Sequence, residues 1–464
     1  MELDPLILAR VQFAFTISFH IIFPAFTIGL SAWIATLLGI SLWTGDPHYR
    51  DLAQFWTKIF AVSFAMGVVS GIVLTYQFGT NWSAFSLAAG NVIGPLIGLE
   101  VLTAFFLEAS FLGIMLFGRD RVSPQLHFAS AVLVAIGTAI SAFWILSANS
   151  WMQYPAGHEV RDGIAYPVDW WQIIFSPTFH WRFVHMLIAA YITTGFVVLA
   201  VGARFWLKGK HLIEAETMMK MALGILVVLT PVQAVVGDFH GLNTLEHQPA
   251  KIAGMEAHWD GNHPAPLVLF AIPDEEAEMN RFELAIPKLG SLILKHDLNA
   301  TFPGLKQFAP EDRPPVLPIF ISFRVMVGIG LVMIALSVIG AFKWWRGHLF
   351  RPGWLMQIFA WTWPLGFIAV LAGWITTEIG RQPWVATGLM RTEDALSPVG
   401  GVAVLVSLVL FVLVYAVIFV SGGYYINRLL EKGPVRHIPK EDLRPTRPMA
   451  AAKDAGRIAL SAGE

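Results

Sequence analysis

The chain has 464 residues, of which 56% are hydrophobic and 14% charged, and its formal net charge is −1. Soluble domains have about 45–50% apolar and about 25% charged residues, so the composition excludes a water-soluble protein and indicates an integral membrane protein. Because cysteine is absent, disulfides, iron–sulfur clusters and thiolate-bound haem or zinc are excluded, and no basic tract suggests a nucleic-acid partner.

Nine apolar runs are long enough to cross a bilayer, whose hydrocarbon core of about 30 Å requires roughly 20 helical residues. The first run follows Glu2 and Asp4 and exceeds the about 7–15 apolar residues of a signal peptide, so we expect it to be retained. The sequence therefore predicts an all-α membrane protein. The nine spans are expected near residues 11–40, 55–78, 92–117, 126–150, 183–207, 217–237, 319–342, 355–377 and 398–424.

Lys and Arg residues concentrate after the odd-numbered spans, whereas the loop 81–91 has none. By the positive-inside rule, the N-terminus is expected outside, on the periplasmic face, and the C-terminus in the cytoplasm. The basic residues that carry this prediction are Arg50, Arg119, Arg121, Arg204, Lys208, Lys210, Lys343, Arg346, Arg351, Arg428, Lys432, Arg436, Lys440, Arg444 and Arg447.

The predicted organisation has four parts: spans one to six in residues 1–237, an external loop in 238–315, spans seven to nine in 316–424, and a cytoplasmic tail in 425–464. A loop as long as 238–315 is usually functional or disordered. Within it, the segment from Asp274 to Leu298 is expected to form an interfacial amphipathic helix interrupted at Pro287. No internal repeat is evident, which weakens the interpretation as an inverted-repeat transporter.

Three residues in the spans are candidate haem ligands. His20 lies in an apolar part of span one, where it either bonds to a neighbouring helix or ligates a haem iron. His185 and Met326 lie near the starts of spans five and seven, which both begin outside, so their depths should match. Histidine with methionine is a low-spin haem pair, and Arg324 is positioned to pair with a propionate. Met326 could instead fill a gap in the core.

Two carboxylates in span three, Glu100 and Glu108, are difficult to explain structurally. Eight residues correspond to about 12 Å of helix and roughly 80° of rotation, so both side chains can face one polar track, which favours a proton path or a ligand role. At the end of span eight, Glu378 and Arg381 are spaced for an intrahelical ion pair, but Gln382 and two tryptophans crowd the same boundary.

With these motifs, nearly the whole chain resembles subunit I of the cytochrome bd-type quinol oxidases. The external loop resembles the quinol-binding loop of that family and is of its short type, and the chain also resembles the branch called cyanide-insensitive oxidase. The motifs are Gly-Arg-Gln-Pro-Trp at 380–384, Phe-Arg-x-Met at 323–326, Gly-Leu-Glu at 98–100, Phe-Phe-Leu-Glu at 105–108, Trp-Ile-Leu-x-Ala-Asn and Trp-Met-Gln within 144–153, and Pro-Ala-Lys-Ile-Ala-Gly-Met-Glu at 249–256.

The resemblance implies a haem-binding bundle and assigns roles to individual residues. His185 and Met326 would bind a low-spin haem b, with Arg324 beside it. His20 and Glu378 would ligate a high-spin haem b and a haem d, or a third haem b in place of haem d. Which of these two haems each residue binds stays open. The remaining roles are Trp374 and Arg381 close to the high-spin pair, Glu100, Glu108 and Ser141 on a proton path, and Lys251 and Glu256 in contact with quinol.

The function that this resemblance implies is that of a terminal respiratory oxidase in the bacterial inner membrane. Quinol would be oxidised at the external face, and O2 would be reduced to water with cytoplasmic protons, generating proton motive force without pumping. The expected partners are a second membrane subunit, subunit II, and a small single-helix subunit. Two alternatives stay open: a haem-free proton-coupled transporter, and a haem b quinol dehydrogenase that does not reduce O2.

Overall fold

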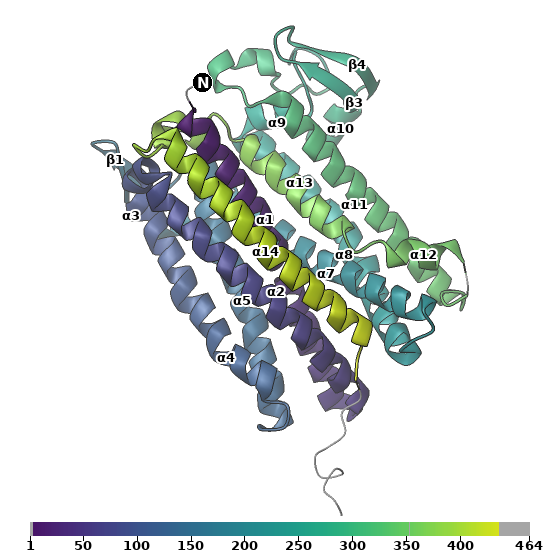
Figure 1. The fold of residues 1–464 in the computed structure, drawn as a ribbon. Coiled ribbons are helices and arrows are strands. Elements are labelled where there is room, and N and C mark those ends of the chain that lie inside the picture. Colours follow the sequence, from purple (N-terminus) through teal and green to yellow (C-terminus); the bar gives the residue numbers. More distant parts are fainter. Residues whose placement is uncertain (1–2, 352, 436–464) are drawn as a thin grey trace, which may run out of the picture.

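The computed structural model describes residues 3–351 and 353–435. In this part of the chain, eight helices are long and apolar enough to cross a membrane, and a bent pair of helices is a ninth candidate (Figure 1). The expected helical membrane architecture is confirmed, with nine spans if the bent pair is one span. The unbent spans are α1 (Pro5–Thr44), α2 (Pro47–Thr80), α3 and α4 (Ser83–Glu100, Phe106–Phe117), α5 (Pro124–Gln153), α6 and α7 (Trp170–Ile174, Phe179–Leu207), α8 (Leu212–His247), α11 (Val316–Trp345) and α14 (Gly401–Lys432).

Three of these helices begin with the same local signal, a capping side chain followed by proline. Asp4 accepts hydrogen bonds from the backbone of α1, Asp46 from that of α2, and Ser123 from that of α5. The capping oxygen satisfies an otherwise unpaired N–H, and proline at the first position lacks the donor that would be unpaired there.

The eighth predicted span, near 355–377, is not one continuous helix. It consists of α12 (Trp354–Ala360) and α13 (Leu365–Ile379), which are bent by 53° relative to each other. Pro364 lies in the break. Proline removes a backbone donor and disfavours the helical conformation of the residue before it, which accounts for the interruption.

Two helices extend furthest beyond their predicted ends. α8 ends at His247 rather than near residue 237, and α14 ends at Lys432 rather than near 424. An apolar run marks the part of a helix that fits the bilayer, whereas backbone hydrogen bonds continue the helix through polar residues. Residues 425–432 of the expected tail are therefore helical, and residues 436–464 lie outside the described part.

The amphipathic helix expected over residues 274–298 is wrong for most of its length. The segment between α8 and α11 contains α9 (Pro249–Met255), an antiparallel hairpin of β3 (Leu267–Asp274) and β4 (Met279–Ile286), and only a short α10 (Leu289–Lys295). Asp274 accepts a hydrogen bond from the Ala277 amide at the turn and forms an ion pair with Arg281. Both contacts lower the pKa of Asp274. These cross-turn contacts favour a hairpin over a helix.

The smaller remaining elements lie in the other connections and complete the fold. They are β1 (His158–Arg161), β2 (Ile164–Pro167), β5 (Trp384–Ala386) and β6 (Met390–Arg391), with 3₁₀ turns at Leu305–Gln307, Pro310–Asp312 and Glu393–Ala395. β1 pairs with β2 and β5 with β6, both antiparallel.

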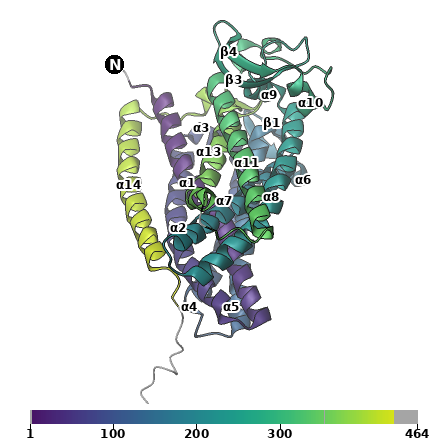
Figure 2. The same cartoon turned by 90° about the vertical axis from the view of Figure 1, so that its right-hand side faces the viewer.

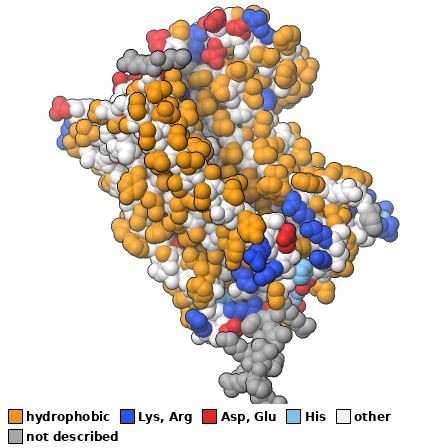
Figure 3. Space-filling model, viewed as in Figure 1, with side chains coloured by type: hydrophobic (Ala, Val, Ile, Leu, Met, Phe, Trp, Pro, Cys, Tyr) orange, Lys and Arg blue, Asp and Glu red, His pale blue; other side chains and the backbone are white. Residues whose placement is uncertain are grey.

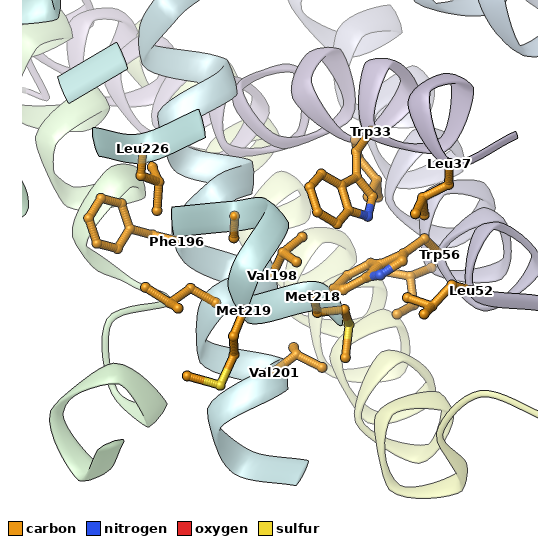
Figure 4. Close-up of a cluster of buried hydrophobic side chains, with 14 of the residues drawn as sticks. Trp33, Leu37, Leu52, Trp56, Phe196, Val198, Val201, Met218, Met219 and Leu226 are labelled. Atoms are coloured by element: carbon orange, nitrogen blue, oxygen red, sulfur yellow. The ribbon is translucent and has the colours of Figure 1, made fainter. Parts of the chain in front are cut away.

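Helix α1 lies at the centre of the bundle and packs against α2, α5, α7, α13 and α14. Trp33 of α1, Trp56 of α2, Phe196 of α7 and Met218 of α8 belong to one buried hydrophobic cluster (Figure 4). Figure 2 shows α14 at the outer edge beside α1. Hydrophobic side chains cover the flank of the bundle, and Lys and Arg side chains gather near the end away from β3 and β4 (Figure 3).

Candidate functional site

His20 projects from α1 toward α2. Its Nδ1 lies 2.9 Å from Oγ of Ser70. At the next residue, Gly71, an added Cβ would lie 3.1 Å from the imidazole Cε1. The bond to a neighbouring helix that the sequence allowed is therefore present. It occupies Nδ1 and leaves Nε2 without a hydrogen bond in the described part of the chain, so ligation through Nε2 is compatible with it.

Glu100 and Glu108 both contact α5. Oγ of Ser141 donates to Oε1 of Glu100 at 2.7 Å. At Gly137, an added Cβ would lie 2.7 Å from Cγ of Glu108. Because Ser141 and Gly137 are one helical turn apart on α5, the two carboxyl groups lie along one face of α5. We call Glu100, Glu108 and Ser141 the acidic track.

A π-helical turn, Val101–Phe105, lies between the two acids. Such a turn holds one extra residue, so it turns Glu108 back by about 100° relative to a regular helix. The rotation of roughly 80° expected from the spacing is therefore wrong, and the two carboxyl groups are more closely aligned than predicted. Glu108 is 6% exposed, and its Oε1 has no hydrogen-bond partner among the described residues.

His185 and Met326 each face a glycine of a neighbouring helix. At Gly237 of α8, an added Cβ would lie 3.4 Å from Cε1 of His185, and at Gly373 of α13 it would lie 2.8 Å from the Met326 sulfur. Helices α7, α8, α11 and α13 pack against one another in a ring of pairs. The two side chains thus lie in one group of four helices. Nδ1 of His185 is buried and has no partner among the described residues.

Glu378 lies at the end of α13 within a dense polar network. Its Oε1 accepts from Nδ2 of Asn149 at 2.9 Å and from Nε2 of Gln153 at 3.1 Å. Its Oε2 forms an ion pair with Arg381, as the spacing predicted. Arg182, 7% exposed, donates to Oδ1 of Asn149. Oε1 of Glu378 is therefore anchored by α5, and Oε2 by the arginine that lies just after the end of α13.

Lys251 of α9 reaches the same network from the segment between α8 and α11. Its Nζ donates to Oε1 of Gln153 and, at 2.9 Å, to Oε1 of Gln248. Its side chain packs over Gly380, where an added Cβ would lie 2.8 Å from Cγ of Lys251. Burial, with Arg182 nearby, lowers the pKa of Lys251 well below its ordinary value. We call this set, Glu378, Arg182, Arg381, Lys251, Asn149, Gln153 and Gln248, the Glu378 cluster.

Glu256 and Arg324, which the sequence placed at different sites, form one ion pair with an N–O distance of 2.7 Å. Nε of Arg324 also donates to the Val268 carbonyl of β3 at 2.6 Å. The glutamate predicted to contact quinol is thereby joined to the arginine predicted to lie beside the low-spin haem. Met326 is two residues from Arg324 on the same helix.

Trp374 connects α13 to the surroundings of His20. It packs against a small cluster that contains Ile21 of α1 and Val370 of α13, and Met186 of α7 packs against the same cluster. Ile21 follows His20 in the chain, and Met186 follows His185. Helices α1, α7 and α13, which carry His20, His185 and Glu378, therefore converge at one point in the bundle.

The residues present fit haem better than a bare metal ion. Among residues 3–351 and 353–435, no group of three or more His, Asp or Glu side chains could hold a metal ion. A haem iron requires only one or two axial ligands from the protein. The Glu378 cluster also holds Arg182, Arg381 and Lys251 around a single carboxylate, and an excess of buried cations suits anionic propionates. The glycines beside His20, His185 and Met326 let each of these side chains pack closely against the backbone of a neighbouring helix.

Sequence reasoning missed several residues that complete these sites. Asn149 and Gln153 lie in a motif that was recognised, but no role followed from it. Arg182 precedes His185 by three residues, and Ser70 gives no local signal, because its partner His20 lies on another helix. Buried polar residues in an apolar span were the available sign for all four.

Comparisons with known proteins agree with one another. The sequence model of the family described as cytochrome bd terminal oxidase subunit I matches residues 8–434. The chain is 34% identical to cytochrome bd ubiquinol oxidase subunit 1 of Bacillus subtilis (strain 168), over 93% of this chain and 94% of that protein. It is 31% identical to cytochrome bd-II ubiquinol oxidase subunit 1 of Escherichia coli (strain K12), over 93% and 97%.

A solved structure, that of the bd oxidase from Geobacillus thermodenitrificans, is similar with a TM-score of 0.86 and 32% identity. It covers 93% of this chain and 100% of the matched chain. The resemblance seen in the sequence motifs is thereby confirmed. The chain belongs to the family of cytochrome bd terminal oxidase subunit I, the haem-containing membrane subunit of a quinol oxidase that functions with a second subunit.

Proposed function

We propose that this chain oxidises quinol at the end of the bundle that carries β3 and β4 and reduces O2 to water within the bundle. The observation that carries the proposal is the convergence of α1, α7 and α13 around Ile21 and Trp374. It supports a site at which His185, His20 and Glu378 would hold haems near one another. Haem, when bound, supplies the one-electron redox chemistry and the site at which O2 is reduced.

The haem ligands in this proposal are those that the sequence suggested. His185 and Met326 bind a low-spin haem b, with Arg324 beside it, and their places within one group of four packed helices support this assignment. His20 and Glu378 bind the high-spin haem b and haem d, or a third haem b in place of haem d. Arg381 and Arg182 of the Glu378 cluster orient and neutralise anionic groups there.

The quinol site is formed by Lys251 and Glu256. Both are buried, and both lie in α9 or directly after it, in the external segment. Lys251 is hydrogen-bonded into the Glu378 cluster and Glu256 to Arg324. Glu256 is positioned to accept a proton from a quinol hydroxyl and Lys251 to hold the quinol oxygen, so that protons are released on the external side.

Protons for the reduction of O2 follow the acidic track from the opposite side. α4 leads from Glu108 toward the end of the bundle away from the β3–β4 hairpin (Figure 1). Glu108, whose Oε1 has no partner among the described residues, takes up the proton. The proton then moves along the acidic track to Glu100, which Ser141 holds in place. Releasing and consuming protons on opposite faces moves charge across the membrane without a pump, equivalent to about 2.3 kcal/mol per charge per 100 mV.

The protein would function in the bacterial inner membrane with its N-terminus in the periplasm and its C-terminus in the cytoplasm. A small single-helix subunit would complete the assembly with subunit II. Exposed apolar side chains along α14 and α11, including Val406, Leu413 and Leu331, are suited to lipid or to these subunits.

Two measurements on the purified complex, a reduced-minus-oxidised spectrum and oxygen uptake with quinol, distinguish the proposed function from two alternatives. A haem-free proton-coupled transporter would show no haem bands in a reduced-minus-oxidised spectrum of the purified complex. A haem b quinol dehydrogenase would show haem bands but no oxygen uptake with quinol as sole donor. The proposal predicts both haem bands and oxygen uptake, and the family to which the chain belongs favours it over both alternatives.

Substitution of the proposed axial methionine tests the ligand assignment. Met326→Leu keeps the volume of the side chain but removes the sulfur that binds iron, so the low-spin haem bands should disappear while the high-spin bands stay. Met333→Leu, a buried methionine of the same helix, is the matched control and should leave the spectrum unchanged. An unaltered spectrum in Met326→Leu would contradict the assignment.

A further inference from the structure

Ser70 of α2 is the hydrogen-bonding partner of His20, and the direction of that bond can be deduced. Oγ of Ser70 lies 2.9 Å from Nδ1 of His20, and it also donates to backbone carbonyls one turn earlier, 3.0 Å from Met66 O and 2.9 Å from Gly67 O. A serine hydroxyl has a single proton. We assign that proton to the backbone carbonyls, which can only accept, so that the lone pairs of Oγ face the imidazole and Nδ1 is the donor.

The direction of this bond determines which nitrogen of the neutral imidazole carries the hydrogen. With Oγ of Ser70 as the acceptor, the ring is in the tautomer with hydrogen on Nδ1. In that tautomer Nε2 carries a free lone pair, as an imidazole needs to bind a metal.

Ser70 is itself held in place. It is 1% exposed, and its backbone carbonyl accepts a hydrogen bond from the Tyr415 hydroxyl of α14 at 3.3 Å. The ring of Tyr415 lies against Phe19, the residue before His20, with ring centroids 4.5 Å apart. Gly71 contacts the edge of the imidazole and leaves no room for a side chain. Three helices thus fix the orientation of the His20 ring.

The other candidate haem histidine lacks such a partner. Nδ1 of His185 is buried, and no described residue offers it a hydrogen bond. The two imidazoles therefore differ at Nδ1, which is hydrogen-bonded in His20 and has no partner among the described residues in His185. A hydrogen bond from that nitrogen to an acceptor raises the basicity of the ligating one and so strengthens its bond to iron.

We propose that Ser70 is a positioning residue that sets the tautomer and ring plane of His20 and thereby tunes the haem iron that His20 binds. The inference rests on the proposed role of His20 as an axial ligand. It assigns to α2 a part in the haem site, although α2 contributes no ligand of its own.

The test uses the purified complete complex and two readouts that activity does not supply. One is the iron–histidine stretching band of the ferrous haem in resonance Raman spectra, and the other is the reduction potential of that haem. In Ser70→Ala, His20 itself is unchanged, so we expect the haem to be retained. The band should shift to lower frequency and the potential should rise, while the haem bound by His185 is unchanged.

Three further variants make the result specific. Ser70→Thr keeps the hydroxyl and should restore both wild-type values, whereas Ser70→Cys keeps the volume but offers a weak acceptor and should shift both in the direction of Ser70→Ala. Ser63→Ala removes another buried serine of α2 and should change neither. Wild-type values in both Ser70→Ala and Ser70→Cys, with the haem still present, would overturn the inference. Equal shifts in Ser63→Ala would overturn it as well.

A fourth variant separates failure of this inference from failure of the proposed function. His20→Ala should lose one haem and keep the low-spin haem. If His20→Ala retains every haem, the ligand role of His20 is wrong. If His20→Ala loses a haem while Ser70→Ala and Ser70→Cys leave its band and potential unchanged, only the role of Ser70 is wrong.

Discussion

The Glu378 cluster and the acidic track are both buried polar regions of the bundle, and they are built in opposite ways. In the cluster, one carboxylate has both oxygens bonded and is surrounded by three cations. In the track, Glu108 has an oxygen without a partner and no cation beside it among the described residues. A fully bonded, cation-rich region is suited to holding anionic groups still, whereas a carboxyl with a free oxygen is suited to taking up and releasing a proton.

The comparison predicts its largest effect at Glu378. Glu378→Gln keeps the size of the side chain but leaves Arg182, Arg381 and Lys251 buried without an anion, a change that typically costs about 3–5 kcal/mol. We expect loss of a haem and a lower midpoint of thermal unfolding, measured by pigment extraction and calorimetry. Glu431→Gln, at the exposed end of α14, is the control. Full haem content and an unchanged midpoint in Glu378→Gln would show that the negative charge of Glu378 does not stabilise the Glu378 cluster.

Glu108 should behave in the opposite manner. Glu108→Gln removes a proton carrier without leaving a buried cation unpaired, so we expect the haem content to stay and the rate of oxygen uptake to fall about 10²-fold. Oxygen uptake with quinol as donor measures the rate, and the absolute spectrum measures the haem. Wild-type turnover in this variant would remove Glu108 from the proton path.

A smaller effect is expected from the residue that Glu108 packs against. Gly137→Ala would place a Cβ 2.7 Å from Cγ of Glu108 and push the carboxyl along the track. A displacement of this kind costs roughly 1 kcal/mol, which corresponds to about fivefold in rate. Gly113→Ala on α4, where nothing lies within 4 Å of the added atom, should have no effect. Equal rates in the two variants would indicate that the packing at Gly137 does not position Glu108.

The smallest effect concerns the exposed ion pair of Asp274 and Arg281 in the β3–β4 hairpin, which contrasts with the buried pair of Glu378. The hairpin contacts lower the pKa of Asp274 in the folded state. Their contribution to stability is therefore present above the unfolded pKa of about 3.9 and is lost as the pH falls through the lower folded value. In the wild type, the protection of the hairpin amides against hydrogen exchange, taken relative to their intrinsic exchange rates, should decrease on acidification. In Asp274→Asn this pH dependence should be absent. If the pH dependence persists in that variant, a titratable group other than Asp274 causes it.

The sequence predicted the membrane architecture well, because long apolar runs leave few alternatives to helices. It also singled out His20, Glu100, Glu108 and Glu378, since ionisable residues in apolar spans are conspicuous. The family resemblance supplied their roles, which no contact in the structure tests directly. The break at Pro364 could have been expected from proline chemistry alone.

Other features depend on contacts between distant segments and could not be predicted. The π-helical turn at Val101–Phe105 has no local sequence signal, yet it determines that Glu100 and Glu108 face α5 together. Ser70, Arg182 and Gln153 acquire their roles from partners on other helices. The hairpin at β3 and β4 replaced an expected helix because cross-strand pairing outweighed the apparent helical period of residues 274–298.

The central claim is that quinol is oxidised on the side of the β3–β4 hairpin and that O2 is reduced with protons from the other side. Proton release by the complete complex in liposomes, recorded on both sides together with oxygen uptake, tests it most directly. We expect one proton to be released on the hairpin side for each electron transferred to O2. We expect an equal number of protons to be consumed from the opposite side. Proton uptake and release on the same side, or oxygen uptake without any haem in the complex, would contradict it.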